Sequence, residues 1–402
     1  MTEKLAIEGG VPVRQNPFPR WPIWDEKEER LLLEVLHSGD WGMLSGTKVQ
    51  AFEQAFAAYQ HARYGICVVN GTAALEIALR AVGVGPGDEV ITTPYTFIAT
   101  VNAIISVGAL PIFVDIDPET AAIDIDRIEE AITAKTKAIM PVHIAGQPAD
   151  MDGILTIAQR HKLRVVEDAC QAWGAEWRGQ RVGALGELGT FSFQASKNIT
   201  AGEGGILVTN DDYLADLCWS LHNVGRRKGG LWYEHVRQGG NYRMTEWQGA
   251  ILLAQLERAD ELARRRHENA LHLDESLRSI PGIDPLRVDS RVTRHAWHLF
   301  VFRYKREVFG GLPRQDFIAA LQAEGVPCTP GYLPLNESPA LQDGLRKLQA
   351  FRKDISPPPA CPVAERLSQE EAVWLPQNLL LGGEKEINDI VEAIAKIKHW
   401  HK

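Results

Sequence analysis

One lysine, Lys197, lies in a stretch whose pattern is otherwise that of a buried strand and a tight turn. Residues 191–205 read FSFQASKNITAGEGG, and Phe191 and Phe193 alternate with Ser192. This alternation predicts a strand that turns the serine hydroxyl to one face. Lysine forms Schiff bases with carbonyl compounds when burial or a nearby charge deprotonates part of its population. A lysine near a strand is more often a surface residue, so its neighbours in the fold decide between the two interpretations.

Two acids end a second apolar run, VVEDACQAWG, at residues 165–174. Ligands of open α/β sheets bind at the carboxyl ends of the strands, so Glu167 or Asp168 is placed to meet one. The competing interpretation is a helix N-cap, a position that aspartate also favours. A carboxylate at this edge of a sheet suits a protonated ring nitrogen.

Two further stretches carry a phosphate signal and an aromatic signal. In NGTAALEIAL (70–79), Gly71 and Thr72 precede an amphipathic helix, whose free N–H groups and dipole favour a phosphate. The same residues also serve as an ordinary turn and cap. In TTPYTFIAT (92–100), Phe97 follows a strand end, where it can stack on a flat ring or pack in the core.

These four stretches form a consistent set. A lysine for the aldehyde, a carboxylate for the ring nitrogen, a helix start for the phosphate and an aromatic plate are what pyridoxal phosphate requires. Lys197 would hold the cofactor, and Asp168 would keep its pyridine nitrogen protonated. No zinc or other metal site is predicted, because the five cysteines are widely spaced and no CxxC occurs.

The elements that must position these residues alternate between strands and helices. Helical spacing covers 26–38, 48–60 and 72–83. Short β-branched runs predict strands at 88–93, 110–116, 138–144, 163–169, 189–194 and 205–210. The spacing of the first four predicts βαβ units and a mostly parallel sheet, while the closer spacing of the later ones predicts a reversed strand. Residues 211–222 and 245–278 have helical patterns, and a strand at 295–305 and helices at 314–324 and 384–397 form a separate α+β unit.

The chain divides into three parts on this pattern. Residues 1–25, rich in Pro, Gly and Trp, form an N-terminal arm, residues 26–270 a large domain and residues 271–402 a small α+β domain. The glycine-rich, aromatic and basic loop at 223–244 is long for a compact domain and therefore functional or disordered.

Composition limits the classes of partner. The chain has 402 residues and a formal net charge of −9, which argues against nucleic acid and anionic membranes. The N-terminus lacks the apolar segment of a signal peptide, and no apolar run is long enough to span a membrane. The odd number of cysteines fits a reducing cytoplasm.

The sequence resembles the DegT/DnrJ/EryC1/StrS family of pyridoxal-phosphate aminotransferases, which aminate keto-sugars and keto-cyclitols. The resemblance covers nearly the whole chain. Its motifs are VVNGTAALEIAL, TTPYTFIATVNAI, FVDID, PVHIAGQPADMD, VVEDACQAWGA, FSFQASKNITAGEGGILVTN, GGNYRMTEWQGAILLAQL and HAWHLFVFR. It implies an α/β fold of type I, similar to aspartate aminotransferase, with a mostly parallel seven-stranded sheet in the large domain.

The resemblance also implies site residues. Lys197 matches the Schiff-base lysine and Asp168 the partner of the pyridine nitrogen, while Gln171 matches the residue near the ring 3-hydroxyl. Phe97 matches the stacking position. The phosphate contacts match Gly71, Thr72, Ser192 and, from the neighbouring subunit of a homodimer, Asn241. Some members replace the lysine by histidine and dehydrate sugars, so the lysine here favours transamination.

We expect transfer of an amino group from L-glutamine or L-glutamate to a keto-cyclitol such as scyllo-inosose, or to a related keto-sugar. The alternatives are a nucleotide-linked keto-sugar aminotransferase, an enzyme similar to aminohydroxybenzoate synthase, and a non-catalytic pyridoxal-phosphate-binding regulator. A lyase or desulfurase would want a reactive cysteine loop, which the sequence does not offer. Arginine is the usual partner of a donor carboxylate. The candidate substrate residues are Arg243, Arg226, His295 and Tyr332.

Overall fold

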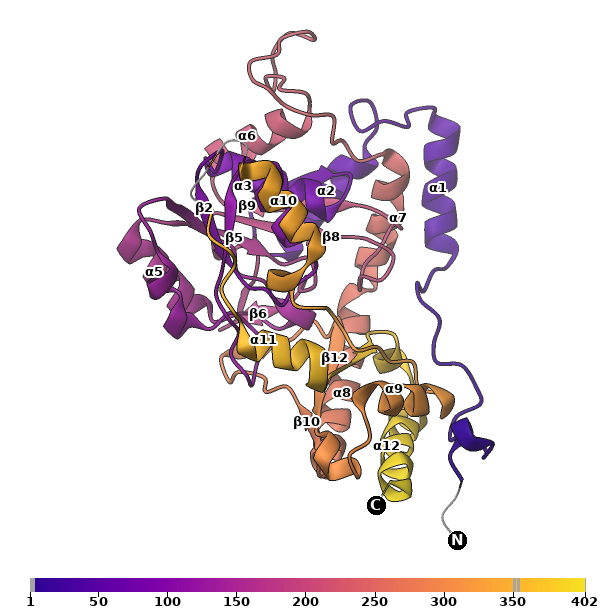
Figure 1. The fold of residues 1–402 in the computed structure, drawn as a ribbon. Helices are drawn as coiled ribbons and strands as arrows, with labels where there is room; N and C mark the ends of the chain where they lie inside the picture. Colours follow the sequence, from indigo (N-terminus) through magenta and orange to yellow (C-terminus); the bar gives the residue numbers. More distant parts are fainter. Residues whose placement is uncertain (1–3, 350–351, 353–354, 402) are drawn as a thin grey trace.

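A seven-stranded sheet forms the centre of the larger part of the molecule (Figure 1). The computed structural model describes residues 4–349, 352 and 355–401. In spatial order the strands are β1 (Tyr64–Val68), β9 (Gly205–Thr209), β8 (Leu188–Ser192), β5 (Arg164–Asp168), β4 (Thr136–Ile139), β2 (Glu89–Thr92) and β3 (Leu110–Phe113). Strand β9 runs antiparallel to both of its neighbours, and the other pairings are parallel. The predicted mostly parallel sheet with one reversed strand is confirmed.

Helices cover both faces of this sheet, because both faces of its strands are apolar. Along β5, Val165 packs on one face and Val166 on the other. The first face is covered by α2 (Lys48–Tyr59), α5 (Met151–His161) and α7 (Glu246–Glu257). The second is covered by α3 (Gly71–Ala81), α4 (Ala99–Ser106) and α6 (Asp212–His222). Helix α1 (Glu26–Ser38), which has the predicted bounds, packs on α7 at the flank of the molecule (Figure 1).

A second apolar core lies around a three-stranded antiparallel sheet of β10 (Ile283–Pro285), β12 (Leu299–Tyr304) and β13 (Ala372–Pro376). Helices α8 (Ala259–Arg278), α9 (Arg314–Ala323) and α12 (Glu384–Trp400) pack on it. Leu5 and Phe18 of the N-terminal segment also belong to this core. Helix α8 begins at the first core and ends in the second, so it crosses residue 270. The domain boundaries therefore stay a prediction.

The remaining elements are short. A three-stranded sheet consists of β6 (Glu176–Trp177), β7 (Gln180–Arg181) and β11 (Val292–Arg294), and two further helices are α10 (Pro339–Gln349) and α11 (Pro362–Arg366). The 3₁₀-helices are η1 (Ala6–Glu8), η2 (Ile125–Arg127), η3 (Glu129–Ala131), η4 (Ile144–Gly146), η5 (Arg306–Phe309), η6 (Leu335–Glu337) and η8 (Leu379–Leu381), and η7 (Leu367–Glu371) is a π-helix. Among the described residues, no helix has the length and apolar character that crossing a bilayer requires.

Three predicted elements differ most from the structure. The strand predicted at 138–144 is β4, which spans Thr136–Ile139, and Pro141, which has no N–H to donate to the sheet, follows within two residues. The helical pattern at 245–278 is interrupted at Arg258, whose non-helical backbone (φ −101°, ψ 3°) caps α7 while its guanidinium binds Glu28 of α1. The strand predicted at 295–305 begins only at Leu299, because Trp297 has a φ of 51°. That turn proves important for the site.

Candidate active site

The carboxyl ends of β5 and β8 meet the N-terminus of α3 at a cavity of about 560 Å³. The residues that line it are Asn70, Gly71, Thr72, Leu75, Thr96, Phe97, Ala99, Thr100, Val142, Asp168, Cys170, Gln171, Ser192, Gln194, Ser196, Lys197, Glu203, His298 and Tyr332. Residues predicted from four separate stretches of sequence are thus brought together. The cavity lies at the edge of the sheet where α/β folds bind ligands.

Lys197 follows β8 in a short turn, in which its backbone N–H donates to the Gln194 carbonyl at 2.8 Å. Its ammonium group makes no hydrogen bond or ion pair with the residues that the structure describes. Burial lowers the pKa of Lys197, and Cys170 and Asp168 offset part of this effect. A half-buried amine with a lowered pKa and no fixed partner is the form of lysine that reacts with carbonyl carbon.

Glu167 and Asp168 are adjacent on β5, but they serve opposite faces of the sheet. Both oxygens of Glu167 are occupied, since they accept hydrogen bonds from the backbone N–H groups of Gly183, Leu185 and Gly186 at 2.6–2.8 Å and from His143. Asp168 points to the cavity and accepts from the Thr100 hydroxyl at 2.7 Å and the Cys170 N–H at 3.2 Å. The structure therefore resolves the choice between the two acids: Asp168 is the one available to a ligand.

Ser192 and the start of α3 form a tight cradle. Phe191 and Phe193 are buried against α2 on one face of β8, so Ser192 faces α3. A Cβ added to Gly71 would lie 2.8 Å from the Cβ of Ser192, so only glycine fits there. Asn70 caps the helix by accepting from the Ala73 N–H at 2.9 Å. The N–H groups of Gly71 and Thr72 have no acceptor within the helix, as an anion site requires.

Aromatic side chains form another wall of the cavity. The Phe97 ring is 52% exposed and lies 5.9 Å from the Tyr332 ring. Gln171 donates to the Tyr332 hydroxyl at 2.9 Å and accepts from the Ala145 N–H at 2.7 Å. A half-exposed phenylalanine beside a cavity is available to cover a flat ligand.

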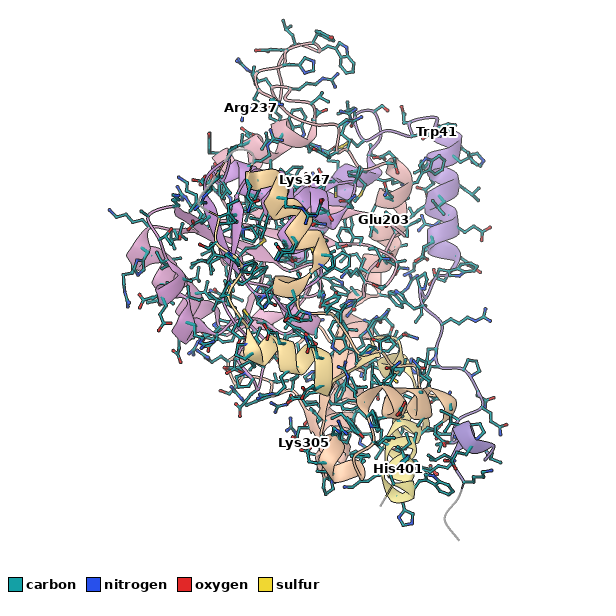
Figure 2. The ribbon with its side chains drawn as sticks, in the orientation of Figure 1. Trp41, Glu203, Arg237, Lys305, Lys347 and His401 are labelled. Carbon is teal, nitrogen blue, oxygen red and sulfur yellow. The ribbon has the colours of Figure 1, made fainter. Side chains whose placement is uncertain are left out.

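Three predicted residues lie outside the cavity of this chain. Asn241 is exposed, and Arg243 donates to the Asn223 side chain at 2.9 Å. The Arg226 guanidinium lies 4.0 Å above the Trp232 ring. All three belong to the segment 223–244, which projects from the body of the molecule beyond α6 (Figure 1) and carries Arg237, labelled in Figure 2.

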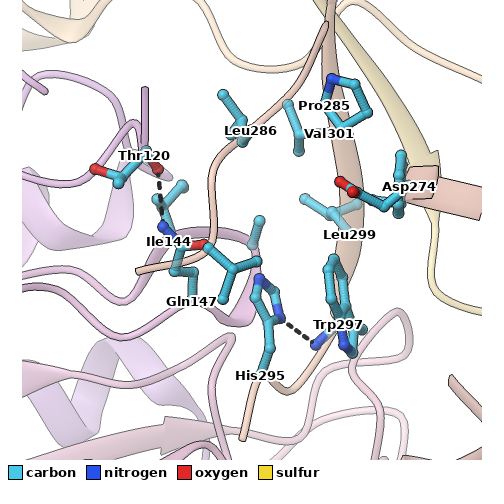
Figure 3. Close-up of a pocket in the computed structure, with 13 residues that line it drawn as sticks. Thr120, Ile144, Gln147, Asp274, Pro285, Leu286, His295, Trp297, Leu299 and Val301 are labelled. Carbon is cyan, nitrogen blue, oxygen red and sulfur yellow. Dashed lines mark hydrogen bonds between the residues drawn. The ribbon is translucent and has the colours of Figure 1, made fainter. Parts of the chain in front are cut away.

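His295 also lies elsewhere. It borders a separate cavity of about 20 Å³ (Figure 3), where its Nδ1 accepts from the Trp297 N–H at 2.8 Å and its ring stacks on the Trp297 indole at 3.8 Å. The turn at Trp297 places the next residue, His298, at the large cavity instead. Only His295 of the HAWH sequence was predicted as a site residue. Both histidines are buried to 6% exposure, and the positive φ of Trp297 accompanies the turn that places His298, and not His295, at the large cavity.

Sequence reasoning missed other residues that line the cavity, among them Thr100, Cys170 and Glu203 (labelled in Figure 2). Thr100 had a signal, because it lies one helical turn after Thr96 at the start of an amphipathic segment, and the two hydroxyls are 2.8 Å apart. Glu203, in the glycine-rich turn, had none.

The residues present fit pyridoxal phosphate. The glycine cradle and free helix N–H groups suit its phosphate, the Asp168 carboxylate its ring nitrogen, the Phe97 ring its flat face and the unpaired Lys197 amine its aldehyde.

Comparison with known proteins gives one consistent family. The model of the DegT/DnrJ/EryC1/StrS aminotransferase family matches residues 22–395. A Streptoalloteichus tenebrarius protein named "Putative L-glutamine:3-amino-2,3-dideoxy-scyllo-inosose aminotransferase" is 41% identical over 99% of this chain and 98% of its own. The L-glutamine:2-deoxy-scyllo-inosose aminotransferase of the same organism is 36% identical over 100% and 99%. The crystal structure of 3-amino-5-hydroxybenzoic acid synthase superposes with a TM-score of 0.87 at 34% identity, over 96% of this chain and 99% of that one.

The match covers the first apolar core, all of the second except Leu5, Phe18 and Ile397, and every strand that borders the cavity, and the seven-stranded sheet agrees with fold type I. The chain therefore belongs to the DegT/DnrJ/EryC1/StrS aminotransferase family and is a pyridoxal-phosphate-dependent aminotransferase.

Proposed function

We propose that this enzyme transfers the amino group of L-glutamine to a keto-cyclitol of the scyllo-inosose type. The observation that carries the proposal is the unpaired, low-pKa Lys197 in one cavity with Asp168 and the cradle of Gly71 and Ser192. The choice of substrates is supported by the names of the two Streptoalloteichus relatives, which align over nearly their whole length.

In this proposal each residue has one task. Lys197 holds the cofactor and then carries the proton that leaves the Cα of the amino donor. Asp168 pairs with the ring nitrogen, and Thr100 orients Asp168 through the 2.7 Å hydrogen bond. When bound, pyridoxal phosphate supplies an aldehyde that takes up the amino group and a ring that takes up the electrons of the broken Cα–H bond.

The remaining contacts follow the geometry. Gly71, Thr72 and Ser192 hold the phosphate, Phe97 covers the ring, and Gln171 with Tyr332 borders its hydroxyl side.

The site would be completed by a second copy of the chain. Asn241 and Arg243 lie outside this chain's cavity, on a segment whose Leu231 and Tyr233 side chains are 81% and 82% exposed. In a homodimer, Asn241 would reach the partner's phosphate site, and Arg243 or Arg226 would meet the donor carboxylate. The location that fits this chemistry is the cytoplasm.

One other acceptor has a specific observation in its favour. The fold superposes closely on 3-amino-5-hydroxybenzoic acid synthase, so a cyclic ketone that leads to an aminohydroxybenzoate is the second candidate. Nucleotide-linked keto-sugars form the third.

A two-step assay separates these candidates. L-Glutamine is added to the purified enzyme, and conversion of the lysine-bound cofactor to pyridoxamine phosphate is followed by absorbance. A panel of keto-inositols, cyclic keto acids and nucleotide-linked keto-sugars is then offered to the pyridoxamine form. We expect keto-inositols to restore the original spectrum fastest. Faster restoration by another class would replace the proposed acceptor, and no conversion by any amino donor would contradict transamination.

A further inference from the structure

His298 is a polar side chain of the cavity that none of the tasks above uses. It immediately precedes β12, its ring is buried to 6% exposure, and it comes from the part of the chain that forms the second core. It therefore reaches the cavity from the second core, and not from the seven-stranded sheet or α3. Its Nδ1 lies 3.1 Å from Oδ1 of Asn198, the residue that follows Lys197.

The surroundings fix which ring nitrogen of His298 carries the proton. Asn198 donates from Nδ2 to the Ala296 carbonyl at 2.7 Å, and since a carbonyl only accepts, the amide orientation is determined. Asn198 Oδ1 is then an acceptor, so Nδ1 of His298 must carry the hydrogen. In the neutral ring, Nε2 is left with a lone pair.

Nε2 of His298 is available to a ligand. It makes no hydrogen bond with the described residues, yet it is not among their buried polar atoms that are sealed from solvent. Burial, together with the positive charges of Lys197 and Arg266, holds the pKa of His298 well below its usual value. The ring thus stays neutral and presents a preoriented hydrogen-bond acceptor to the cavity.

We propose that Nε2 of His298 accepts a hydrogen bond from a hydroxyl group of the keto acceptor and so selects hydroxyl-bearing ketones. This inference rests on the proposed function and names a contact within it. The carboxylate of the amino donor cannot bond to this lone pair, and the side-chain amide of L-glutamine, which can, is distinguished by the test below, because that contact would make the L-glutamine half-reaction depend on Nε2. A polyhydroxylated ring, in contrast, carries hydroxyl donors beside the reacting carbon. A site built to bond a hydroxyl discriminates against analogues that lack it.

The test compares the two half-reactions in His298→Asn. Asparagine keeps an N–H near the Nδ1 position for Asn198 and removes Nε2 together with Cε1. We expect the rate constant of the keto-cyclitol with the pyridoxamine form to fall about tenfold, the loss of one hydrogen bond. The half-reaction with L-glutamine should change by less than about twofold. His298→Gln, whose amide oxygen reaches the Nε2 position, should recover part of the ketone rate, and His295→Asn serves as the control outside the cavity.

A second arm uses keto-cyclitols that lack one hydroxyl beside the carbonyl. The unmodified enzyme should lose about tenfold on the analogue that lacks the recognised hydroxyl, and His298→Asn should not lose it again. Equal losses in both half-reactions, or no loss in the ketone half-reaction, would overturn the role of Nε2. If the unmodified pyridoxamine form ignored every keto-cyclitol, the proposed function itself would fail, and this assignment with it.

Discussion

His295 and His298 are three residues apart in the chain and border two different cavities. The cavities differ in whether a ligand can reach the polar groups that line them. Around the cavity of about 20 Å³, Nδ1 of His295 accepts from the Trp297 N–H and its ring stacks on the Trp297 indole (Figure 3), and although its Nε2 has no partner among the described residues, this cavity has room for no more than a water molecule. Around the cavity of about 560 Å³, the Lys197 ammonium and His298 Nε2 have no partner among the described residues. Glu167 and Asp168 repeat the contrast on β5, since the former is saturated by four donors and the latter keeps room for a ligand.

This difference distinguishes the polar side chains that stabilise the fold from those that are available to bind a ligand. A buried polar group whose hydrogen bonds are all made stabilises the folded protein. Removing one of its partners lowers the free energy of unfolding. A polar group without a partner marks the site only where it also borders a cavity large enough for a ligand, since buried atoms such as Trp21 Nε1 and His222 Nε2 also lack partners and do not line this cavity. Variants of the two sets should therefore fail in different assays.

The largest expected effect is the loss of activity in Lys197→Ala. We expect turnover to fall by about 10³-fold or more and the absorbance of the lysine-bound cofactor to vanish, because no other amine lines the cavity within the described residues. The free energy of unfolding should change little, since the ammonium has no fixed partner. Steady-state turnover and urea unfolding check both points, with Lys137→Ala as a surface control. A Lys197→Ala enzyme that keeps its activity would contradict the role of Lys197 in binding the cofactor and transferring the proton.

The two acids of β5 provide the sharpest contrast. Asp168→Asn should lower kcat/KM on the order of 10²–10³-fold and leave the free energy of unfolding within about 1 kcal/mol. Glu167→Gln should cost about 2–4 kcal/mol of stability, because its amide N–H₂ would meet backbone N–H donors. Urea midpoints and kcat/KM for both variants decide the matter. The reverse pattern would show that the roles are exchanged.

A smaller effect is expected at the aromatic wall. Phe97→Ala should weaken retention of the cofactor by up to about tenfold, the value of one stacking contact, while Phe97→Tyr should retain it. Because the ring is 52% exposed, the unfolding of the cofactor-free protein should hardly change. Cofactor titration of the two variants measures this, and equal affinities for Phe97→Ala and the unmodified enzyme would remove Phe97 from the site.

The last expected effect concerns His295 and leaves the activity unchanged, since it appears only in the pH dependence of stability. Burial, and secondarily His267, lowers the pKa of His295 to about 3, whereas the unfolded value is about 6.5. Below about pH 6.5 the unfolded chain binds a proton that the folded chain does not, so stability is lost as the pH falls towards 3. His295→Asn should reduce this slope by up to about 1.4 kcal/mol per pH unit. Urea unfolding between about pH 6 and pH 4 measures it, and an unchanged slope would contradict the neutral state of His295.

The sequence predicted the parts of the fold that depend on periodicity. Strands β5 and β8, the helix start at Gly71 and the alternation around Ser192 follow from side-chain patterning. The strand β1 was missed, because Gly65 interrupts the apolar pattern of its YGICV sequence, and the helix break at Arg258 depends on a tertiary contact with Glu28. The distinction between His295 and His298 needed the backbone of Trp297, which no local pattern encodes.

The role of Lys197 in transamination is tested most directly by finding which lysine carries the cofactor. The enzyme is isolated with pyridoxal phosphate, reduced with borohydride and mapped by peptide mass spectrometry. We expect the phosphopyridoxyl group on the peptide that contains Lys197. When L-glutamine is added before reduction, the group should be absent from that peptide. A modification on another lysine, or one that L-glutamine does not prevent, would contradict this role of Lys197.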